Sequence, residues 1–176
     1  MHLSSQLLLI DFILSIPAGA HESLDVGSQD VNGCYRVHFN NTGKPYTGLD
    51  VAAGPNVDVV VADPYHWTEL GERRFDVVVS GQCLEHVEYP WLTMAEMFRV
   101  TNPGGLLCVI VPSNGPEHRY PLDCYRYFPD GLAALARFAG FEVLSCQLHR
   151  GATTWDWDDT RLIAKKPVRG SSDGER

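Results

Sequence analysis

The chain has 176 residues, 44% apolar and 20% charged, which is typical of one globular domain with a substantial core. Its net charge of -8 argues against a broad phosphate-binding surface, which would need clustered Lys and Arg, so no nucleic-acid substrate is expected. The five cysteines are dispersed and form no C-x-x-C pair, which indicates reduced thiols and excludes a disulfide framework.

The N-terminal segment is apolar from Leu7 to Leu14, but it does not fit a signal peptide well. No Lys or Arg precedes Arg36, and Asp11 interrupts the apolar run. The segment is also too short to span a membrane. We therefore expect residues 1–20 to form a helix packed on a sheet in a cytoplasmic protein, with a signal peptide as the less favoured alternative.

The first half of the chain alternates strand and helix signals. We expect strands at 24–27, 46–51, 57–62 and 75–79, a short helix within 30–39, and a helical turn or two within 64–74. The run Phe75-Asp-Val-Val-Val79 is rich in β-branched residues, as in a strand that is buried on both faces.

The second half continues the alternation. Residues 90–100 read as a helix with proline in its first turn, and Pro103-Gly-Gly105 as a turn into a strand at 106–111. A capped helix at 130–139, ended by Gly140, precedes an antiparallel strand pair at 142–148 and 160–164. We expect one domain over 1–168, a disordered tail at 169–176, and a doubly wound α/β fold.

Acidic residues stand at the ends of the first two predicted strands. Asp25 precedes the turn that contains Gly27, and Asp50 follows 25 positions later. This order is typical of a βαβ unit that holds a nucleoside by its ribose hydroxyls. The pattern predicts a cofactor that contains adenosine.

Six sequence blocks together resemble one enzyme family. They are LDVGS at 24–28, YTGLDV at 46–51, VVVADP at 59–64, FDVVVSGQCLEHVEYPW at 75–91, RVTNPGGLLCVIVPS at 99–113 and AGFEVL at 139–144. In this order they resemble the class I S-adenosylmethionine-dependent methyltransferases, closest to the small type-11 enzymes. The resemblance covers residues 24–164. It implies a Rossmann-like, seven-stranded, mostly parallel sheet with an antiparallel edge strand, in a three-layer sandwich.

The resemblance also implies roles for the strand-end residues. Asp50 would accept both ribose hydroxyls, Val51 would press on the adenine, and Asp63 would read its exocyclic amine. Asp25 would lie near the amino-acid end of the cofactor, and Gly27 would let the backbone approach it. The expected cofactor contacts are Asp25, Gly27, Ser28, Asp50, Val51, Asp63, Pro64, Ser80 and Gly81. Gln29 replaces the second glycine of the usual G-x-G-x-G turn, which leaves open a degenerate domain that has lost its ligand.

The catalytic residues are less visible. His86 follows the fourth strand and is the best candidate for a general base, although a structural role is equally open. The segment 116–129 is expected to cross the pocket mouth, with His118, Asp123, Tyr120 and Arg126 facing the acceptor. The alternative is that Asp123 and Arg126 pair with each other. The other histidines lack ligand spacing, and no metal site is expected.

The expected activity is methyl transfer to O or N of a small-molecule or saccharide-like acceptor, by a monomer or homodimer. Two alternatives remain: a cofactor-binding but inactive methyltransferase-like partner protein, and, less favoured, an NAD-binding oxidoreductase. The latter should show a fuller G-x-G-x-x-G turn.

Overall fold

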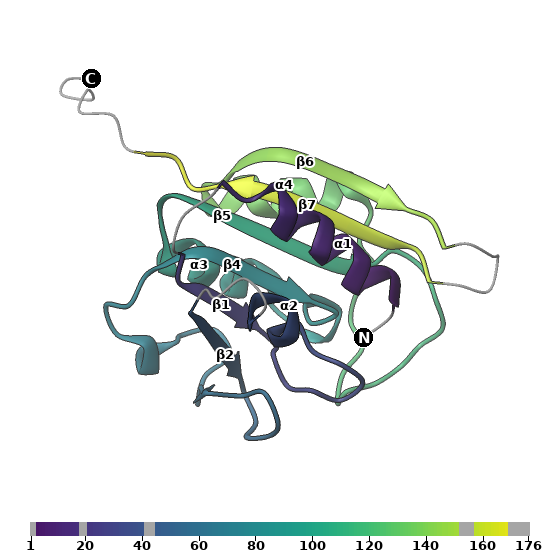
Figure 1. Cartoon of the computed structure of the whole chain (residues 1–176). Coiled ribbons are helices and arrows are strands. Elements are labelled where there is room, and N and C mark those ends of the chain that lie inside the picture. Colours follow the sequence, from purple (N-terminus) through teal and green to yellow (C-terminus); the bar gives the residue numbers. More distant parts are fainter. Residues whose placement is uncertain (1–2, 18–20, 41–44, 152–156, 169–176) are drawn as a thin grey trace.

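The computed structural model describes residues 3–17, 21–40, 45–151 and 157–168. Within these ranges, seven strands form one sheet in the order β3-β2-β1-β4-β5-β7-β6 (Figure 1). The strands are β1 (Ser23–Val26), β2 (Tyr46–Asp50), β3 (Val59–Val60), β4 (Phe75–Gly81), β5 (Thr101–Pro112), β6 (Glu142–His149) and β7 (Asp159–Lys165). The predicted mostly parallel, seven-stranded α/β sheet is confirmed.

The neighbouring strands β3, β2, β1, β4 and β5 pair in parallel, whereas the pairs that involve β7 are antiparallel. β7 lies between β5 and β6 and runs antiparallel to both. On the parallel side, Asp25 of β1 is level with Gly48 of β2 and Val79 of β4. The carboxyl ends of these three strands therefore meet at one edge, where open α/β sheets bind ligands.

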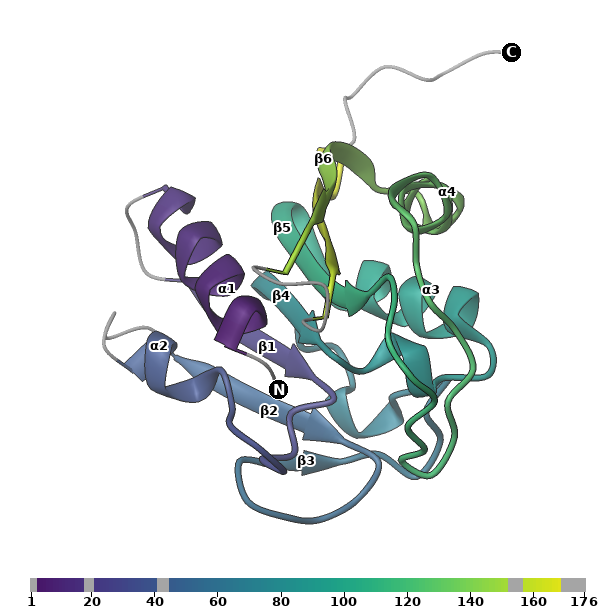
Figure 2. The same ribbon diagram turned by 90° about the vertical axis from the view of Figure 1, so that its right-hand side faces the viewer.

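Helices cover both faces of the sheet, as Figure 2 shows. The helices α1 (Leu3–Ser15) and α2 (Arg36–Asn40) lie on one face, and α3 (Pro90–Val100) and α4 (Pro129–Ala139) lie on the other. Two short 3-10 helices, η1 (Thr68–Leu70) and η2 (Leu84–His86), follow β3 and β4. The three-layer sandwich is thus confirmed.

Two apolar cores, one on each face, hold the layers together. Under α1, Leu9 and Phe12 pack with Tyr35 and with Val79 and Ile110 of the sheet. The core on the other face contains, among others, Leu24, Val78, Met94, Met97, Leu107 and Leu132. Adjacent strand residues such as Val78 and Val79 face opposite cores, which explains the continuous apolar run in β4.

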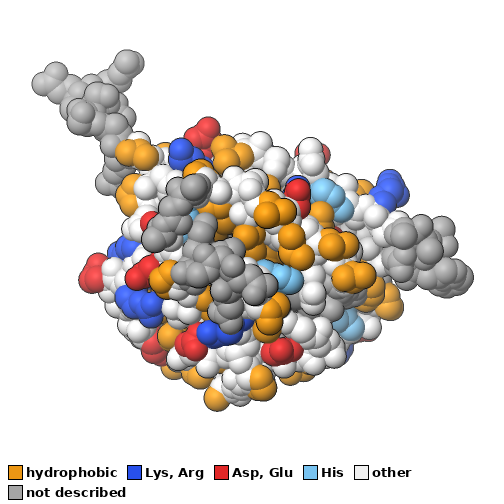
Figure 3. Space-filling view, in the orientation of Figure 1, with side chains coloured by type: hydrophobic (Ala, Val, Ile, Leu, Met, Phe, Trp, Pro, Cys, Tyr) orange, Lys and Arg blue, Asp and Glu red, His pale blue; other side chains and the backbone are white. Residues whose placement is uncertain are grey.

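The N-terminal segment forms the expected helix packed on the sheet. Leu9, Phe12 and Ile13 are buried, whereas Leu3, Leu7 and Leu14 are exposed. Figure 3 shows hydrophobic side chains gathered over α1. Among the described helices, none has the length and apolar character that crossing a membrane requires.

Several predicted boundaries are wrong. The strand expected at 57–62 is only Val59–Val60. The short helix expected within 30–39 is present as Arg36–Asn40, after Gly33 at φ +111°, and extends one residue beyond that range. The expected turn at 103–105 is instead a bulge within β5, since Phe75 pairs with Thr101 but Val77 pairs with Leu106. The predicted tail at 169–176 lies outside the described residues.

Candidate functional site

A cavity of about 690 Å³ opens at the carboxyl ends of the parallel strands. This volume is within the range typical of ligand pockets. Its walls come from the segments that follow β1, β2 and β4, together with the segment 118–122 beyond β5. The cavity therefore lies where the sequence predicts a ligand.

Asp50 stands at the wall of this cavity and organises two of its loops. Its Oδ2 accepts a hydrogen bond from the backbone N–H of Gln29 at 3.0 Å, and its Oδ1 accepts one from Val51 at 2.7 Å. The carboxylate thereby fixes the loop after β1 against the end of β2. It also keeps negative charge at the cavity edge.

Gly27 lets the loop after β1 pass close to the loop after β4. Its φ is +77°, and its N–H donates to the carbonyl oxygen of Leu49 at 2.9 Å. A Cβ at this position would lie 2.4 Å from Sγ of Cys83. Glycine is required here both by its left-handed conformation and by this close approach.

Asp25 lies behind the wall and does not line the cavity. Its side chain is 2% exposed and accepts a hydrogen bond from the Tyr46 hydroxyl at 2.5 Å. Burial raises the pKa of Asp25 to about 7, whereas the hydrogen bond from Tyr46 acts in the opposite direction. Asp63 is exposed and accepts the backbone N–H of Tyr65 at 2.8 Å. Of the three carboxylates expected at one cavity, the structure thus places Asp50 in its lining, whereas Asp25 and Asp63 are not among the lining residues.

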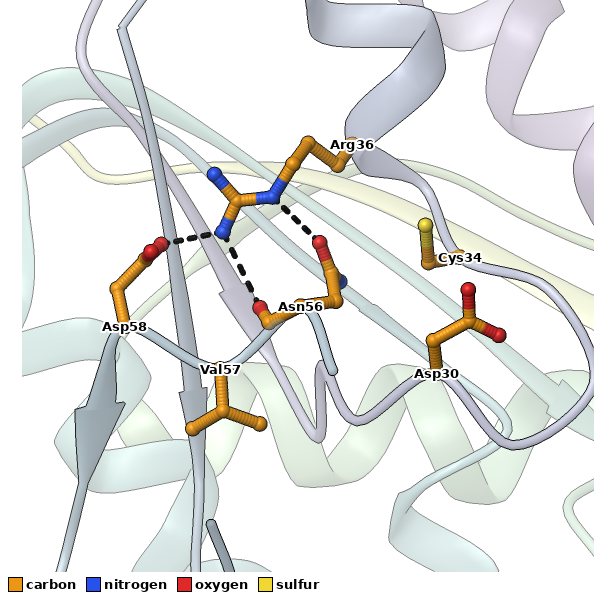
Figure 4. Close-up of a pocket in the computed structure, with 6 residues that line it drawn as sticks. All are labelled: Asp30, Cys34, Arg36, Asn56, Val57 and Asp58. Carbon is orange, nitrogen blue, oxygen red and sulfur yellow. Dashed lines mark hydrogen bonds and ion pairs between the residues drawn. The ribbon is translucent and has the colours of Figure 1, made fainter. Parts of the chain in front are cut away.

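A second, smaller cavity of about 320 Å³ is lined by residues that hold the loop after β1 in place (Figure 4). The Arg36 guanidinium lies between Asp58 and Asn56, donating from Nε to Asn56 Oδ1 at 2.5 Å and pairing with Asp58. The Asn56 amide in turn donates to the carbonyl oxygen of Ser28 at 2.6 Å. These contacts brace the loop that carries Gly27.

The burial of Asp25 predicts a pH dependence of stability. A carboxyl group with a raised pKa binds its proton more tightly when folded than when unfolded, so the free energy of unfolding should fall as pH rises from about 4 to about 7. The neighbouring charged groups, Asp50 and Arg36, act in opposite directions on this pKa. We expect Asp25→Asn, which keeps an acceptor for Tyr46, to be more stable than the parent at pH 8 by up to roughly 4 kcal/mol.

Urea denaturation of both proteins at pH 4.5 and pH 8 measures this effect. The two should differ little at the lower pH. Parallel pH profiles of the parent and the variant would contradict the assigned burial effect.

Glu85 and His86 in η2 form the inner wall of the cavity. Glu85 is fully buried, and burial raises its pKa to about 8. His86 lies with Nδ1 2.6 Å from the carbonyl oxygen of Leu122, and burial lowers its pKa. The carbonyl oxygen of Glu85 accepts the N–H of Cys124 at 2.6 Å. These contacts tie the segment after β5 to the turn after β4.

The segment after β5 crosses the cavity mouth as expected, with His118 and Tyr120 among its lining residues. Asp123 does not line the cavity: its carboxylate accepts the N–H of His118 at 2.7 Å and two bonds from Arg126 at 2.6 and 2.9 Å. These bonds from Arg126 lower the pKa of Asp123. The alternative in which Asp123 and Arg126 pair with each other is thus the arrangement found, and neither faces the cavity.

The predicted site residues fall into two groups. Those that line the cavity are Gly27, Asp50, Val51, Pro64, Gly81, His86, His118 and Tyr120. Those outside its lining are Asp25, Ser28, Asp63, Ser80, Asp123 and Arg126. Ser80 and Ser28 are buried and donate to the carbonyl oxygens of Val26 and Asn56. They stabilise the wall from behind.

The sequence did not reveal five lining residues of the loop after β4, namely Gln82, Cys83, Glu85, Val87 and Glu88. A signal for Glu85 was present, since it directly precedes His86 in the sequence. Gln29 also lines the cavity, and its amide packs against Gly54.

Comparison with known proteins gives a consistent result. Residues 24–109 match the family model described as a methyltransferase domain. An uncharacterized methyltransferase from Mycolicibacterium paratuberculosis is 34% identical over 102 residues, which cover 51% of this chain and 38% of that protein. The chain thus spans about two fifths of the length of the curated relatives it matches.

Solved structures share the fold. A 1,6-didemethyltoxoflavin-N1-methyltransferase from Burkholderia thailandensis, with that compound and S-adenosylhomocysteine bound, is 21% identical with a TM-score of 0.70, covering 94% of this chain and 77% of that one. A putative methyltransferase from Bacillus halodurans is 16% identical with a TM-score of 0.71, covering 93% of this chain and 99% of that one. Residues 24–109, close to half of the chain, thus resemble a methyltransferase domain, and the chain shares its fold with solved methyltransferases.

Proposed function

We propose that the protein transfers a methyl group from S-adenosylmethionine to an oxygen or nitrogen of a small-molecule acceptor. The observation that carries this proposal is that the Asp50 carboxylate and the close loop at Gly27 line the same cavity. A carboxylate and a close backbone loop suit a nucleoside that carries no phosphate. S-adenosylmethionine supplies an electrophilic methyl carbon on a positively charged sulfur.

The cavity walls fit the parts of this cofactor. The Asp50 carboxylate would accept the ribose hydroxyls, while Val51 and Pro64 offer apolar surface to the adenine. The close approach at Gly27 would leave room for the amino-acid portion. The Asp50 carboxylate at the wall also suits a ligand that carries positive charge.

The acceptor side would be formed by the segment over the mouth. Tyr120 and His118 line this part of the cavity, and an aromatic ring beside an imidazole suits a polar, hydroxyl-bearing or saccharide-like acceptor. With Nδ1–H donated to Leu122, Nε2 of His86 would be free to take the acceptor's proton. The lowered pKa of His86 favours the neutral imidazole that this role needs.

Calorimetric titration of the protein with S-adenosylhomocysteine and, separately, with NAD tests the proposal. We expect saturable binding of S-adenosylhomocysteine and none of NAD. Binding of NAD alone would favour the oxidoreductase, and absence of binding by both ligands would favour a domain that has lost its cofactor. Incubation with S-adenosylmethionine and a metabolite extract, followed by mass spectrometry for added methyl groups, would then identify the acceptor.

A further inference from the structure

Three side chains that could bind a metal ion meet at the inner wall of the cavity. Glu85 and His86 come from η2, and His118 comes from the segment after β5. One ligand atom from each lies within 4.8 Å of the others. Because His118 is far from the adjacent Glu85 and His86 in the sequence, their spacing gave no sign of a metal site.

The environment of Glu85 suits a cation ligand. The side chain is 0% exposed, and neither carboxylate oxygen has a hydrogen-bond partner among the described residues. A buried carboxylate without donors is costly, and a buried charge is normally paired or bound to a metal. The nearby Arg126 already donates from both Nη atoms to Asp123.

His86 is oriented as a ligand. Its Nδ1 lies 2.6 Å from the carbonyl oxygen of Leu122, so Nδ1 carries the proton and Nε2 carries the lone pair. That Nε2 lies 3.7 Å from Oε1 of Glu85. Metal-binding histidines typically donate their other ring N–H in this way to a carbonyl or carboxylate.

His118, from the segment after β5, completes the group beside His86. Its ring packs edge-on against the ring of His86, with centroids 4.9 Å apart. Its Nδ1 lies 3.5 Å from Oδ2 of Asp123 and 3.3 Å from Nη2 of Arg126. Because a guanidinium can only donate, Nδ1 of His118 accepts from Arg126 in this structure, and Nε2 carries the proton of the neutral ring. Binding of a metal at Nε2 would displace that proton, and a proton on Nδ1 would then turn toward Asp123, the carboxylate that would orient the ring.

We infer that Glu85, His86 and His118 form a binding site for a divalent transition-metal ion of the zinc class. Two imidazoles and one carboxylate suit such an ion, whereas magnesium and calcium favour oxygen ligands throughout. Ligand atoms around a tetrahedral zinc ion are about 3.4 Å apart, so the partly exposed His118 would move inward on binding. The three ligands leave a fourth position open toward the cavity.

The open position suggests what the ion would do, and this part rests on the proposed methyl transfer. A hydroxyl of the acceptor bound there would lose its proton to water more readily, and its oxygen would keep the electron pair that attacks the methyl carbon. The new O–C bond would form as the S–C bond of S-adenosylmethionine breaks, and S-adenosylhomocysteine would leave with the electron pair of the broken bond. His86 would then be a ligand and not a general base. The two roles exclude each other.

Metal binding by the full chain, stripped with chelator and free of any histidine tag, tests the inference without an activity assay. We expect one equivalent of Co²⁺ to bind and to give the visible absorption of a low-symmetry site, and Zn²⁺ to displace it. Glu85→Gln, His86→Ala and His118→Ala should each weaken Zn²⁺ binding by roughly 100-fold. His21→Ala, which alters a histidine near Asp76 at the start of β4, is the matched control and should bind as the parent does.

Failure of the parent to bind Co²⁺ or Zn²⁺ would overturn the inference, as would equal affinities in the parent and in Glu85→Gln and His118→Ala. Titration of the same samples with S-adenosylhomocysteine verifies that each variant is folded. It also separates the two proposals, because loss of metal binding with retained S-adenosylhomocysteine binding concerns the metal site alone.

Discussion

Asp50→Ala is expected to weaken the binding of S-adenosylhomocysteine by roughly 100-fold or more. The substitution would remove an ionised acceptor for two ribose hydroxyls, each bond contributing about 1.5–3 kcal/mol, and every 1.4 kcal/mol corresponds to about tenfold in affinity. It would also release the backbone N–H groups of Gln29 and Val51, which now donate to this carboxylate. Isothermal titration calorimetry at one pH and salt concentration measures the effect.

The matched control is Asp130→Ala, since Asp130 is an exposed aspartate in the first turn of α4 and does not line the cavity. It should bind S-adenosylhomocysteine as the parent does. Asp50→Asn, which keeps one acceptor oxygen, should lie between the two. If Asp50→Ala bound S-adenosylhomocysteine as tightly as the parent does, the proposed contact between Asp50 and the ribose would be wrong.

Gly27→Ala is expected to lower the free energy of unfolding by roughly 2–5 kcal/mol and to abolish cofactor binding. Alanine in the left-handed region costs about 1–2 kcal/mol, and overpacking adds about 1–3 kcal/mol. The overpacking arises because the new Cβ would lie 2.4 Å from Sγ of Cys83. Urea denaturation monitored by circular dichroism gives the change in stability.

Gly131→Ala provides the control for this substitution. Gly131 lies in α4, where a Cβ would meet nothing within 4 Å, so alanine should leave the stability unchanged or raise it. Equal stabilities of Gly27→Ala and the parent would show that the loop after β1 can move away from Cys83. The assigned need for glycine would then be wrong.

The elements that were predicted well are those whose signals are local. The helix Pro90–Val100 was expected at its observed bounds because proline marks its first turn, and Gly140 ends α4 in the left-handed conformation. The strand expected at 57–62 is shorter than its apolar run suggests. Val60 is exposed at the edge of the described sheet, where β3 has β2 as its partner.

The sequence predicted which strand ends form the site, but not which side chains there face the cavity, and the reason is physical. The strand order places Gly27, Asp50 and Gly81 at one edge, and sequence motifs mark these positions. Whether a side chain at a strand end faces the ligand or the core depends on neighbours distant in sequence. Asp25 is engaged by Tyr46, and Asp123 is engaged by Arg126. The burial of Glu85 depends likewise on the segment after β5, which no local pattern reveals.

The position of β7 has a consequence for how the chain folds during synthesis. β6 is synthesised before β7, yet its partner in the described sheet is β7. The edge of β5 that faces away from β4 also pairs with β7. Until the last strand emerges, one edge of β5 and all of β6 have unpaired backbone groups, which can pair with other chains. Nascent chains halted before Asp159 should therefore depend most on chaperones, and the final seven-residue strand completes both partners in a single step.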